Sequence, residues 1–480
     1  MKIKKPLHLR PQAVVLTVSG VILTWLVLSH SFGAFLADAA PQAATWFDAR
    51  QPEALVNLAD QALSAAVTAQ ASNGAADKAS DQSNSEHEDR RQTGGATATS
   101  PRSIDSAFLS FESLGKTQSI SRPIVPENAP AVRNWATTAL MNDPLNARAL
   151  RILGQLAEAD SNDAEAAEFM HAADRLSLHE RAAAFWLLRN SAAAGDFKSA
   201  IYYADIMLRT TPQSSIYVVP ILAQISEDPA GAALVKALLA GNPPWRAQFI
   251  SVLPDSVTDV RTPLNLLLAL RSDPVPLTVD DIKPYLEFLI THKYYSLAYY
   301  TWLQFLPPDE LRHAGLLYNG NFESAPSGLP FDWKITQGTG VTIDVVPRPG
   351  QSSDRALMVD FQFGRVDYHS VTELVMLTPG TYQFSGEYKG NLVGPRGLKW
   401  RIACAAETAA NVGESAMITG STKAWNNITF TFTIPDKGCD AQYVRLDLDA
   451  RMASEEMVSG SIFFDDLRIS RVAKPAAAGG

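Results

Sequence analysis

The sequence predicts a multidomain α + β protein with a single N-terminal transmembrane helix, an α-helical solenoid and a C-terminal β-sandwich. Three observations support this fold class. An uncharged apolar run lies near the N-terminus, apolar residues then recur at helical spacing in paired segments, and after Pro308 the apolar period changes from 3.6 to 2. A chain of 480 residues has room for two or three such domains.

The bulk composition excludes one class of partner. The formal net charge is -9, the sequence pI is about 5.5, and no cluster of Lys and Arg occurs after the N-terminus. Proteins that bind nucleic acid present basic surfaces, so we expect no nucleic-acid partner. The two cysteines are too few for a structural zinc site or for a disulfide-dense scaffold.

The N-terminal segment has the features of a membrane anchor. Residues 13–37 form an apolar run without Asp, Glu, Lys or Arg, and about 20 residues suffice to cross the hydrocarbon core. Basic residues precede the run (Lys2, Lys4, Lys5 and Arg10), and the first acid is Asp38. The positive-inside rule makes residues 1–12 a cytoplasmic tail and predicts a single-pass protein of the bacterial inner membrane with its bulk in the periplasm. The alternative is a cleaved signal peptide, because "AFLADAA" offers small residues for cleavage.

Residues 38–129 are expected to connect the anchor to the first domain. The stretch from Pro52 to about Gln70 has apolar residues at helical spacing, which predicts a short juxtamembrane helix. Residues 71–103 lose nearly all large apolar side chains, so they cannot bury enough surface to offset chain entropy and are predicted to be a disordered linker. We expect residues 473–480 to be a disordered tail.

The segment 130–312 is predicted to be a stack of paired helices. Small or apolar residues recur 34 positions apart: Ala166 and Ala200, Met170 and Ala204, Ala173 and Met207. Together with Leu153-Gly154 and Pro212, this pattern resembles the tetratricopeptide repeat, which implies a protein-binding solenoid. The aromatic residues of the repeat's first helix are missing and only about two full repeats can be counted, so neighbouring helices have to cap the array. Candidates are 229–240, 245–253, 263–271 and a hairpin over 280–311 with Ala298 at its crossing.

An aromatic run in that hairpin allows two interpretations. It comprises Tyr294, Tyr295, Tyr299, Tyr300, Trp302 and Phe305. Aromatic residues at helical spacing usually pack into a core, and we favour that role over a ligand site.

The segment 314–472 has the alternation of half-buried strands. "NNITFTFTIP" alternates apolar and polar residues from Ile428 to Ile434, and "QYVRLDLDARM" and "RALMVDFQF" follow the same rule. Gly/Pro turns separate these runs, which predicts a β-sandwich.

Four stretches of this segment resemble a known family. They are "LLYNGNFESAPSGLPFDW", "PGTYQFSGEYKG", "KAWNNITFTFTIP" and "GSIFFDDLRISRV". Together they look like a carbohydrate-binding module of the family 4/9 type, which has a jelly-roll, galactose-binding-like fold. Many relatives of such modules pack only against neighbouring domains, so the resemblance indicates the fold more specifically than it indicates sugar binding.

The resemblance also implies one structural calcium ion, and otherwise no cofactor. In that family an opening Glu and an Asp of the closing strand often hold the ion, which here correspond to Glu323 and Asp465, with carbonyls near Asn321. Period 2 places Asp465 on the apolar face of its strand, where a carboxylate needs a partner. Calcium suits carboxylate and carbonyl oxygens. A backbone N–H or an Arg is the alternative partner.

Sugar binding requires exposed aromatic platforms, and few candidates are present. Trp400 alternates with core residues and Trp425 lies at a strand entry, so both are expected to be buried. Trp333 and Tyr368 remain as carbohydrate-binding candidates. The outward rows are charged instead: Arg401, Arg445, Arg451, Asp360, Asp447 and Asp449.

The two cysteines, Cys404 and Cys439, both lie in the sandwich domain. A disulfide is permitted outside the cytoplasm, and two cysteines confined to one extracytoplasmic domain usually pair. We therefore expect a bridge, with two separate buried thiols as the alternative.

No catalytic motif is present in the sequence, which lacks Gly-x-Ser-x-Gly, His-Glu-x-x-His and Walker patterns. The pairs Asp465-Asp466 and Glu455-Glu456 are adjacent on the chain, and neighbours on a strand face opposite ways. We therefore expect no enzymatic activity, a glycoside-active enzyme being the remote alternative.

The leading hypothesis is a membrane-anchored extracytoplasmic scaffold in envelope or exopolysaccharide assembly or export. Its repeats would bind another envelope protein, and its jelly roll would bind a polysaccharide or that partner; this step rests on analogy at the level of folds. The alternative is a glycan-binding receptor in which the jelly roll is the active element.

Overall fold

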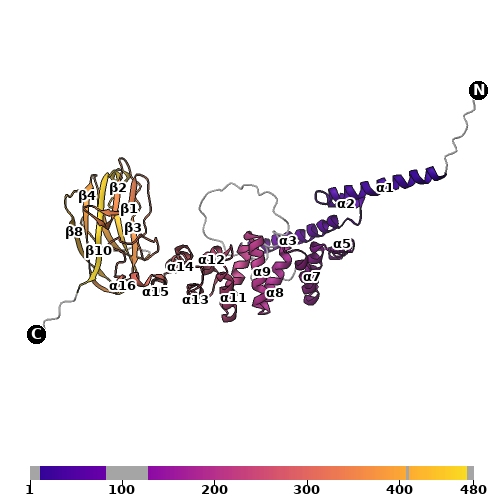
Figure 1. The fold of residues 1–480 in the computed structure, drawn as a ribbon, viewed down its shortest axis with the longest axis horizontal. Coiled ribbons are helices and arrows are strands. Elements are labelled where there is room, and N and C mark those ends of the chain that lie inside the picture. The colour runs from indigo at the N-terminus through magenta and orange to yellow at the C-terminus, as the bar shows by residue number, and fades with distance from the viewer. Residues whose placement is uncertain (1–10, 83–127, 407–409, 473–480) are drawn as a thin grey trace, which may run out of the picture. The chain divides into compact units, whose positions relative to one another are not determined.

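The computed structural model describes residues 11–82, 128–406 and 410–472. The chain divides into two compact units, Met1–Phe249 and Ile250–Gly480, and each is described by itself (Figure 1). In the described part of the chain the first unit is helical, and the second unit combines short helices with a β-sandwich.

The first unit begins with an apolar helix. Within α1 (Pro11–Leu36), residues Val15–Leu36 are long and apolar enough to cross a membrane and are not buried by the rest of the chain, as is also true of a signal sequence. The short helix α2 (Pro41–Phe47) follows and packs against α1, with the rings of Phe32 and Phe47 5.8 Å apart.

The remaining helices of this unit follow in chain order. They are α3 (Pro52–Gln82), α5 (Ala129–Asn142), α6 (Ala147–Ala159), α7 (Asp163–Leu176), α8 (Arg181–Ala193), α9 (Phe197–Thr210), the 3₁₀ turn η1 (Pro212–Ser214), α10 (Ser215–Ile225) and α11 (Pro229–Ala240). Helix α12 (Arg246–Ser256) crosses the division between the units. Helix α3 ends twelve residues later than the expected Gln70, so residues 71–82 are helical rather than part of a linker; residues 83–103 lie outside the described part of the chain.

Local sequence explains where the paired helices begin and how closely they pack. The side chains of Asn146, Asp196 and Asp228 cap α6, α9 and α11 by accepting hydrogen bonds from backbone N–H groups of the first turn. Gly154 of α6 lies against Met170 of α7, and a Cβ added there would come within 3.0 Å of the Met170 side chain. The helical domain is therefore present as predicted, while its assignment to the tetratricopeptide class stays a prediction.

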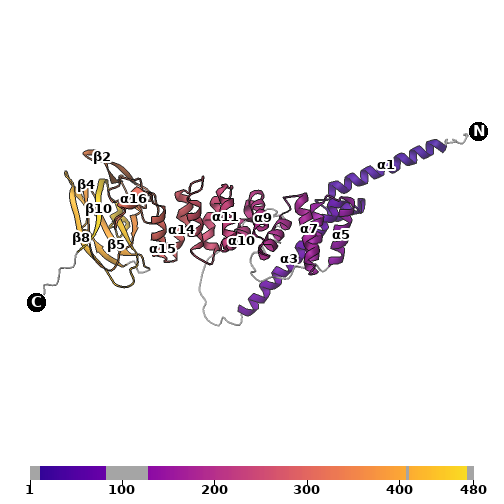
Figure 2. The ribbon, with the colours of Figure 1, turned by 60° about the horizontal axis from the view of Figure 1, so that its bottom comes forward.

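Helix α3 packs alongside α5 and contributes to the same core as α6 (Figures 1 and 2). Leu55, Val56 and Ala59 are buried there against residues of α5 and α6. The segment expected to lead only from the anchor to the first domain is thus part of that domain.

A buried ion-pair cluster joins α3 to α6 and to Glu180, the residue before α8. Asp60 lies 2.7 Å from the Arg148 guanidinium and also pairs with Arg151, whose side chain is 5% exposed. The Nε atom of Arg151 lies 3.0 Å from the carboxylate of Glu180. Burial alone would raise the pKa of Asp60, but the guanidinium groups of Arg151 and Arg148 outweigh it and hold that pKa below its usual value.

The second unit starts with four short helices. They are α13 (Thr262–Leu270), α14 (Val279–Thr291), α15 (Tyr295–Phe305) and α16 (Pro308–His313). Thr278 and Asp281 form a reciprocal capping box at the start of α14. Ala298 of α15 is fully buried, as expected for the residue at the crossing of the hairpin.

Two antiparallel sheets form the sandwich. The strands are β1 (Val341–Arg348), β2 (Gln351–Phe361), β3 (Val371–Val375), β4 (Gly380–Leu392), β5 (Leu398–Cys404), β6 (Asn411–Glu414), β7 (Gly420–Ser421), β8 (Asn426–Ile434), β9 (Gln442–Leu448) and β10 (Gly460–Arg471), with a 3₁₀ turn η2 (Ala453–Glu456) before β10. The six-stranded sheet has the order β1-β2-β10-β4-β7, with β8 also paired to β4, and the four-stranded sheet has the order β3-β9-β5-β6. Their inner faces enclose an aromatic core in which the Trp400 ring lies 5.5 Å from both Phe384 and Phe464.

The opening stretch 316–333 is held against the closing strand. The N–H of Leu467 in β10 donates to the carbonyl oxygen of Gly320 (2.9 Å), and a Cβ on Gly320 would lie 2.1 Å from the Leu467 oxygen. Asn319 and Phe322 both adopt positive φ, and the Asn319 amide exchanges hydrogen bonds with the backbone of Ser324. The Asn-Gly-x-Phe pattern is therefore a tight turn that allows close contact between the two ends of the domain.

The ion-pair cluster of α3 gives the first prediction. Asp60→Asn leaves the buried guanidinium of Arg151 with one carboxylate, Glu180, and the neutral amide of Gln155, and breaking a buried pair from one side costs about 3–5 kcal/mol. Hydrogen exchange of the α3 amides in the full chain should therefore accelerate on the order of 100-fold or more, as measured by mass spectrometry. Glu53→Gln is the matched control, since half-exposed Glu53 meets Arg148 only at 3.4 Å. Equal exchange in the two variants would contradict the prediction.

Candidate functional site

The outer face of the four-stranded sheet is the candidate functional site. On β5 and β9, residues that point into the sandwich alternate with Lys399, Arg401, Arg445 and Asp447, which point away from it. Register places Lys399 opposite Asp447 and Arg401 opposite Arg445. We call this surface the charged face; it comprises Lys399, Arg401, Glu414, Arg445 and Asp447 on the strands, with Ser370, Arg396, Asp449 and Glu455 from adjoining loops.

Hydrogen-bonded ion pairs connect the side chains of the charged face. Arg401 pairs with Asp449, with Glu414 (3.2 Å) and with Asp447 (3.3 Å). Lys399 lies 2.9 Å from Glu414 and 3.5 Å from Asp449, and Arg396 lies 2.9 Å from Glu455. The face therefore presents guanidinium and ammonium donors beside carboxylate acceptors in a fixed arrangement.

Asp447 keeps two like charges together. Arg401 and Arg445 are directly opposite each other in the ladder, which alone would be destabilising. Asp447 is 8% exposed and contacts both, at 3.3 Å and 3.2 Å, while it accepts a hydrogen bond from the Ser370 hydroxyl (2.5 Å).

The acids at the edge of the face are held in their ionised form. Hydrogen bonds from Lys399 and Arg401 lower the pKa of Glu414. Burial would raise the pKa of Asp449, but the Arg401 and Lys399 charges outweigh it, so that this pKa is also lowered. Both groups are therefore hydrogen-bond acceptors at neutral pH.

Helix α15 contacts the end of the same sheet where β5 finishes. The Tyr295 hydroxyl donates to the Ala405 carbonyl oxygen (2.5 Å). Farther along α15, Trp302 packs edge-to-face on Tyr318 and lies 5.6 Å from Phe331. The aromatic run thus divides: Trp302 is buried as core, whereas Tyr294 and Tyr300 are exposed.

Of the two predicted sugar platforms, Trp333 is not on the surface, so the prediction is wrong for this residue. Its ring is fully buried between Phe322 and Trp400, and its Nε1–H donates to the carbonyl oxygen of Asn319 (3.0 Å). Tyr368 is half-buried: its ring packs against Phe361, and its hydroxyl donates to the Leu446 carbonyl oxygen (2.9 Å).

The two expected calcium ligands have other partners. Glu323 is exposed and accepts a hydrogen bond from the N–H of Arg355 (3.0 Å). Asp465 is buried, and its two oxygens accept from the N–H of Asp466 (2.6 Å) and from the Arg348 guanidinium. Within residues 11–82, 128–406 and 410–472, no group of three or more His, Cys, Asp or Glu is arranged to hold a metal ion. The positions of these side chains do not fit a shared calcium site.

Burial raises the pKa of Asp465 to about 6, although the Asp466 N–H and the Arg348 charge act in the opposite direction. The expectation that Asp465 and Asp466 face opposite sides of their strand is also wrong. A bulge between Asp465 and Arg468 interrupts the ladder, so both acids reach Arg348 instead of facing opposite ways.

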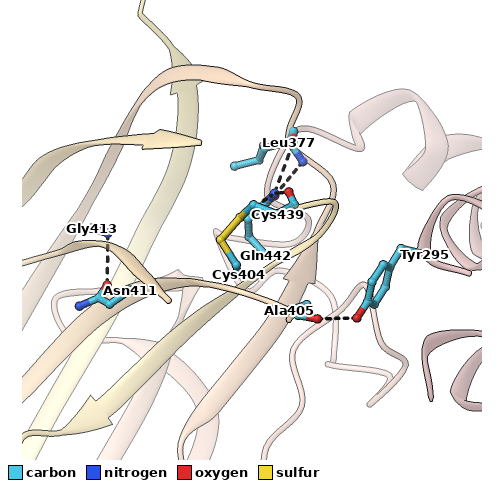
Figure 3. Close-up of a disulfide and its surroundings, with 8 residues drawn as sticks. All are labelled: Tyr295, Leu377, Cys404, Ala405, Asn411, Gly413, Cys439 and Gln442. Carbon is cyan, nitrogen blue, oxygen red and sulfur yellow. Dashed lines mark hydrogen bonds between the residues drawn. A yellow bond between two sulfur atoms is a disulfide. The ribbon is translucent and has the colours of Figure 1, made fainter. Parts of the chain in front are cut away.

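The two cysteines form a disulfide at the end of the four-stranded sheet (Figure 3). The bridge joins Cys404 of β5 to Cys439 in the connection before β9. Buried Gln442 secures the same region: its amide donates to the Cys439 carbonyl oxygen (2.6 Å) and accepts from the N–H of Leu377 (2.9 Å). Ala405, which accepts from Tyr295, directly follows the bridged Cys404.

An unexpected carboxyl group lies inside the sandwich. Glu373 of β3 is 2% exposed and accepts a hydrogen bond from the Tyr318 N–H (2.8 Å), and its Oε2 has no hydrogen-bond partner in the described residues. Burial, and then the nearby Asp332, raise its pKa well above the usual value, with the Tyr318 N–H opposing them.

Sequence reasoning identified part of the charged face and missed the rest. Alternation indicates that Arg401, Arg445, Asp447 and Asp449 point outward. A charged surface does not offer the aromatic rings expected of a sugar site, so the sequence did not identify this face as a binding site. Lys399 has the same signal, since it lies two residues before Arg401. Glu414 lies in a four-residue strand that has no readable period.

No protein-family model and no curated protein matches the chain. Among solved structures, one described as "CBM4 structure and function" is 20% identical, with a TM-score of 0.26, over 32% of this chain and 99% of that one. A "Family 16 Carbohydrate Binding Module-2" is 18% identical, with a TM-score of 0.24, over 33% and 100%. A family 61 module solved with β-1,4-galactotriose is 18% identical, with a TM-score of 0.23, over 33% and 99%.

These structures are carbohydrate-binding modules, the class that the sequence resemblance named.

The disulfide gives the second prediction. Replacing Cys404 and Cys439 with Ser frees a segment with a sequence separation of 35, which should cost about 3–4 kcal/mol in the loop-entropy account. Urea unfolding of the full chain, followed by hydrogen exchange of β5 and β9, measures the loss. Reductant should reproduce it in the wild type and leave the double variant unchanged. An unaltered unfolding midpoint in the variant would contradict this prediction.

The third prediction concerns Glu373 and pH. Because its pKa is raised in the folded state, the folded chain retains this proton above pH 4.5 while the unfolded chain loses it, and stability falls as pH rises. Glu373→Gln cannot ionise, so its melting temperature should exceed that of the wild type by roughly 2–4 °C at pH 8 and match it near pH 4. Thermal scans of the full chain across this range are the measurement, with exposed Glu287→Gln as control. A difference independent of pH would exclude this explanation.

Proposed function

We propose that this chain is a non-enzymatic, membrane-tethered adaptor that binds a polysaccharide on the charged face of its sandwich and another protein on its helical domain. The observation that carries the proposal is the charged face itself. Sugar hydroxyls both donate and accept hydrogen bonds, and Arg401, Lys399, Asp447 and Asp449 supply donors and acceptors side by side.

Rigidity supports a binding role for this face. Each carboxylate of the charged face already has a cationic partner, so a ligand meets groups whose positions are fixed before it arrives. Preorganisation of this kind reduces the ordering cost of binding. Because Trp333 is buried and Tyr368 is half-buried, recognition on the charged face would depend on polar contacts more than on ring stacking.

The placement outside the cytoplasm rests on two supports. The apolar helix α1 follows a basic tail, and the sandwich contains a disulfide, which persists in oxidising compartments. Both features are expected of a protein in the bacterial periplasm that takes part in the assembly or export of an envelope polysaccharide. In that setting α1 would keep the glycan-binding domain near the membrane.

A receptor in which the sandwich alone is the active element is the second candidate. The packing of α15 on the sandwich favours this candidate, because α15 then supports the sandwich and is not part of a separate binding domain. The adaptor requires a protein partner that copurifies with the chain even when the charged face is altered. The receptor requires none.

The fourth prediction tests the charged face. Arg401→Gln removes the side chain that bonds Asp447, Asp449 and Glu414, and should weaken retention on an array of bacterial polysaccharides at least about tenfold, since hydrogen bonds to charged groups contribute roughly 1.5–3 kcal/mol. Arg451→Gln is the control, because exposed Arg451 lies just before η2 and makes its hydrogen bond to Glu455 through the backbone N–H, which the substitution retains. Unchanged retention by a folded Arg401→Gln protein would reject the site.

A further inference from the structure

Two irregularities bring distant parts of the six-stranded sheet to one point. The register of β1 and β2 shifts between Pro347 and Arg348, at the turn that joins these strands. The register of β10 and β4 shifts between Asp465 and Arg468. Asp466, inside the second bulge, has a φ of 53°, in the left-handed region that non-glycine residues rarely adopt. Such a conformation persists only where surrounding contacts hold it.

The Arg348 guanidinium is the group on which these contacts converge. Its Nη1 atom pairs with Asp465 and lies 3.3 Å from Asp466 and 3.4 Å from Asp354. Its Nη2 atom lies 2.6 Å from the carboxylate of Glu387. One cation therefore faces four carboxylates, contributed by β2, β4 and both positions of the β10 bulge.

An aromatic ring covers the same cation. The Cζ atom of Arg348 lies 4.1 Å from the centroid of the Trp425 ring, at the start of β8. This distance is typical of a cation–π contact, which strengthens when the cation is shielded from water. The Arg348 side chain is 12% exposed and the Asp465 side chain is 1% exposed. A strand entry that was expected to bury Trp425 in the core instead places it over a charge.

The four carboxylates around Arg348 require a positive charge at their centre. A carboxylate as buried as Asp465 needs a cationic or hydrogen-bonding partner. Four converging carboxylates are the hard oxygen ligands that calcium prefers. Here a side chain of the chain itself provides the positive charge. A calcium ion and a guanidinium cannot both occupy the centre of the cluster without strong repulsion.

We propose that Arg348 is the built-in cation of this domain: it replaces a structural calcium ion, makes the sandwich independent of metal, and holds the β10 bulge closed.

The fifth prediction has two arms, both on the full chain in detergent. In the first arm, the wild-type melting temperature should shift by less than about 1 °C when EDTA or millimolar calcium chloride is added, because no ion contributes to its stability. A wild-type protein that loses stability in EDTA and regains it with calcium would overturn the proposal.

In the second arm, Arg348→Ala should lower the melting temperature on the order of 5 °C or more, because the buried Asp465 loses its partner. Arg468→Ala is the matched control, since Arg468 is exposed and meets Asp466 only at 3.7 Å. It should not show this loss.

Arg348→Lys keeps the positive charge but loses the planar guanidinium group, so it should be destabilised less than Arg348→Ala. It provides the test if Arg348→Ala does not fold. An Arg348→Ala protein that melts like the Arg468→Ala control would overturn the proposal.

Discussion

The sandwich depends on how its last strand is held at the middle of the six-stranded sheet. Strand β10 lies between β2 and β4, so every other strand of that sheet is placed relative to it. Its bulge is fixed from three sides: by the Arg348 guanidinium, by the Gly320 carbonyl oxygen that accepts from Leu467, and by Gly386 of β4, where a Cβ would lie 2.4 Å from the Leu467 side chain. The two ends of the domain are therefore held by one small set of contacts, of which some require glycine and one requires a cation.

This dependence explains why the sequence predicted the fold better than the site. Period 2 identifies β8, β9 and β10, because alternation is a local property. It is wrong about the side on which Asp465 lies, because the register places this residue opposite Glu387 and one position after the core residue Phe464, and the bulge follows it. It cannot identify Arg348 as the partner of Asp465, since the two residues are 117 positions apart and meet only through paired bulges. Trp333 illustrates the opposite error: a tryptophan in an irregular segment has no period, and only the folded chain shows that it fills the core beside Trp400.

The helical part shows the same limit at a larger scale. The starts of α6, α9 and α11 follow from capping residues that precede apolar periods, and these are readable from the chain. The role of α3 is not readable in this way, because its composition resembles a connector. Its place in the domain depends on Asp60 meeting Arg148 and Arg151, about 90 residues later, within a shared apolar core. A segment adjoining the apolar N-terminal helix is in this way part of the first folded unit.

The charged face and the Arg348 cluster use ionic groups for opposite purposes. In the cluster one cation pairs with four carboxylates and is shielded by Trp425, so these charges stabilise the fold and are not available to a ligand. On the charged face cations and carboxylates are closer to balance and point away from the core, so their hydrogen-bonding capacity is directed outward. Asp447 and Asp449 are nevertheless largely shielded, with side chains 11% and 13% exposed, so these pairs also help to hold the strands and loops of the face together. The same network thus fixes the sheet and sets the positions of the donors and acceptors on which the proposed binding role depends.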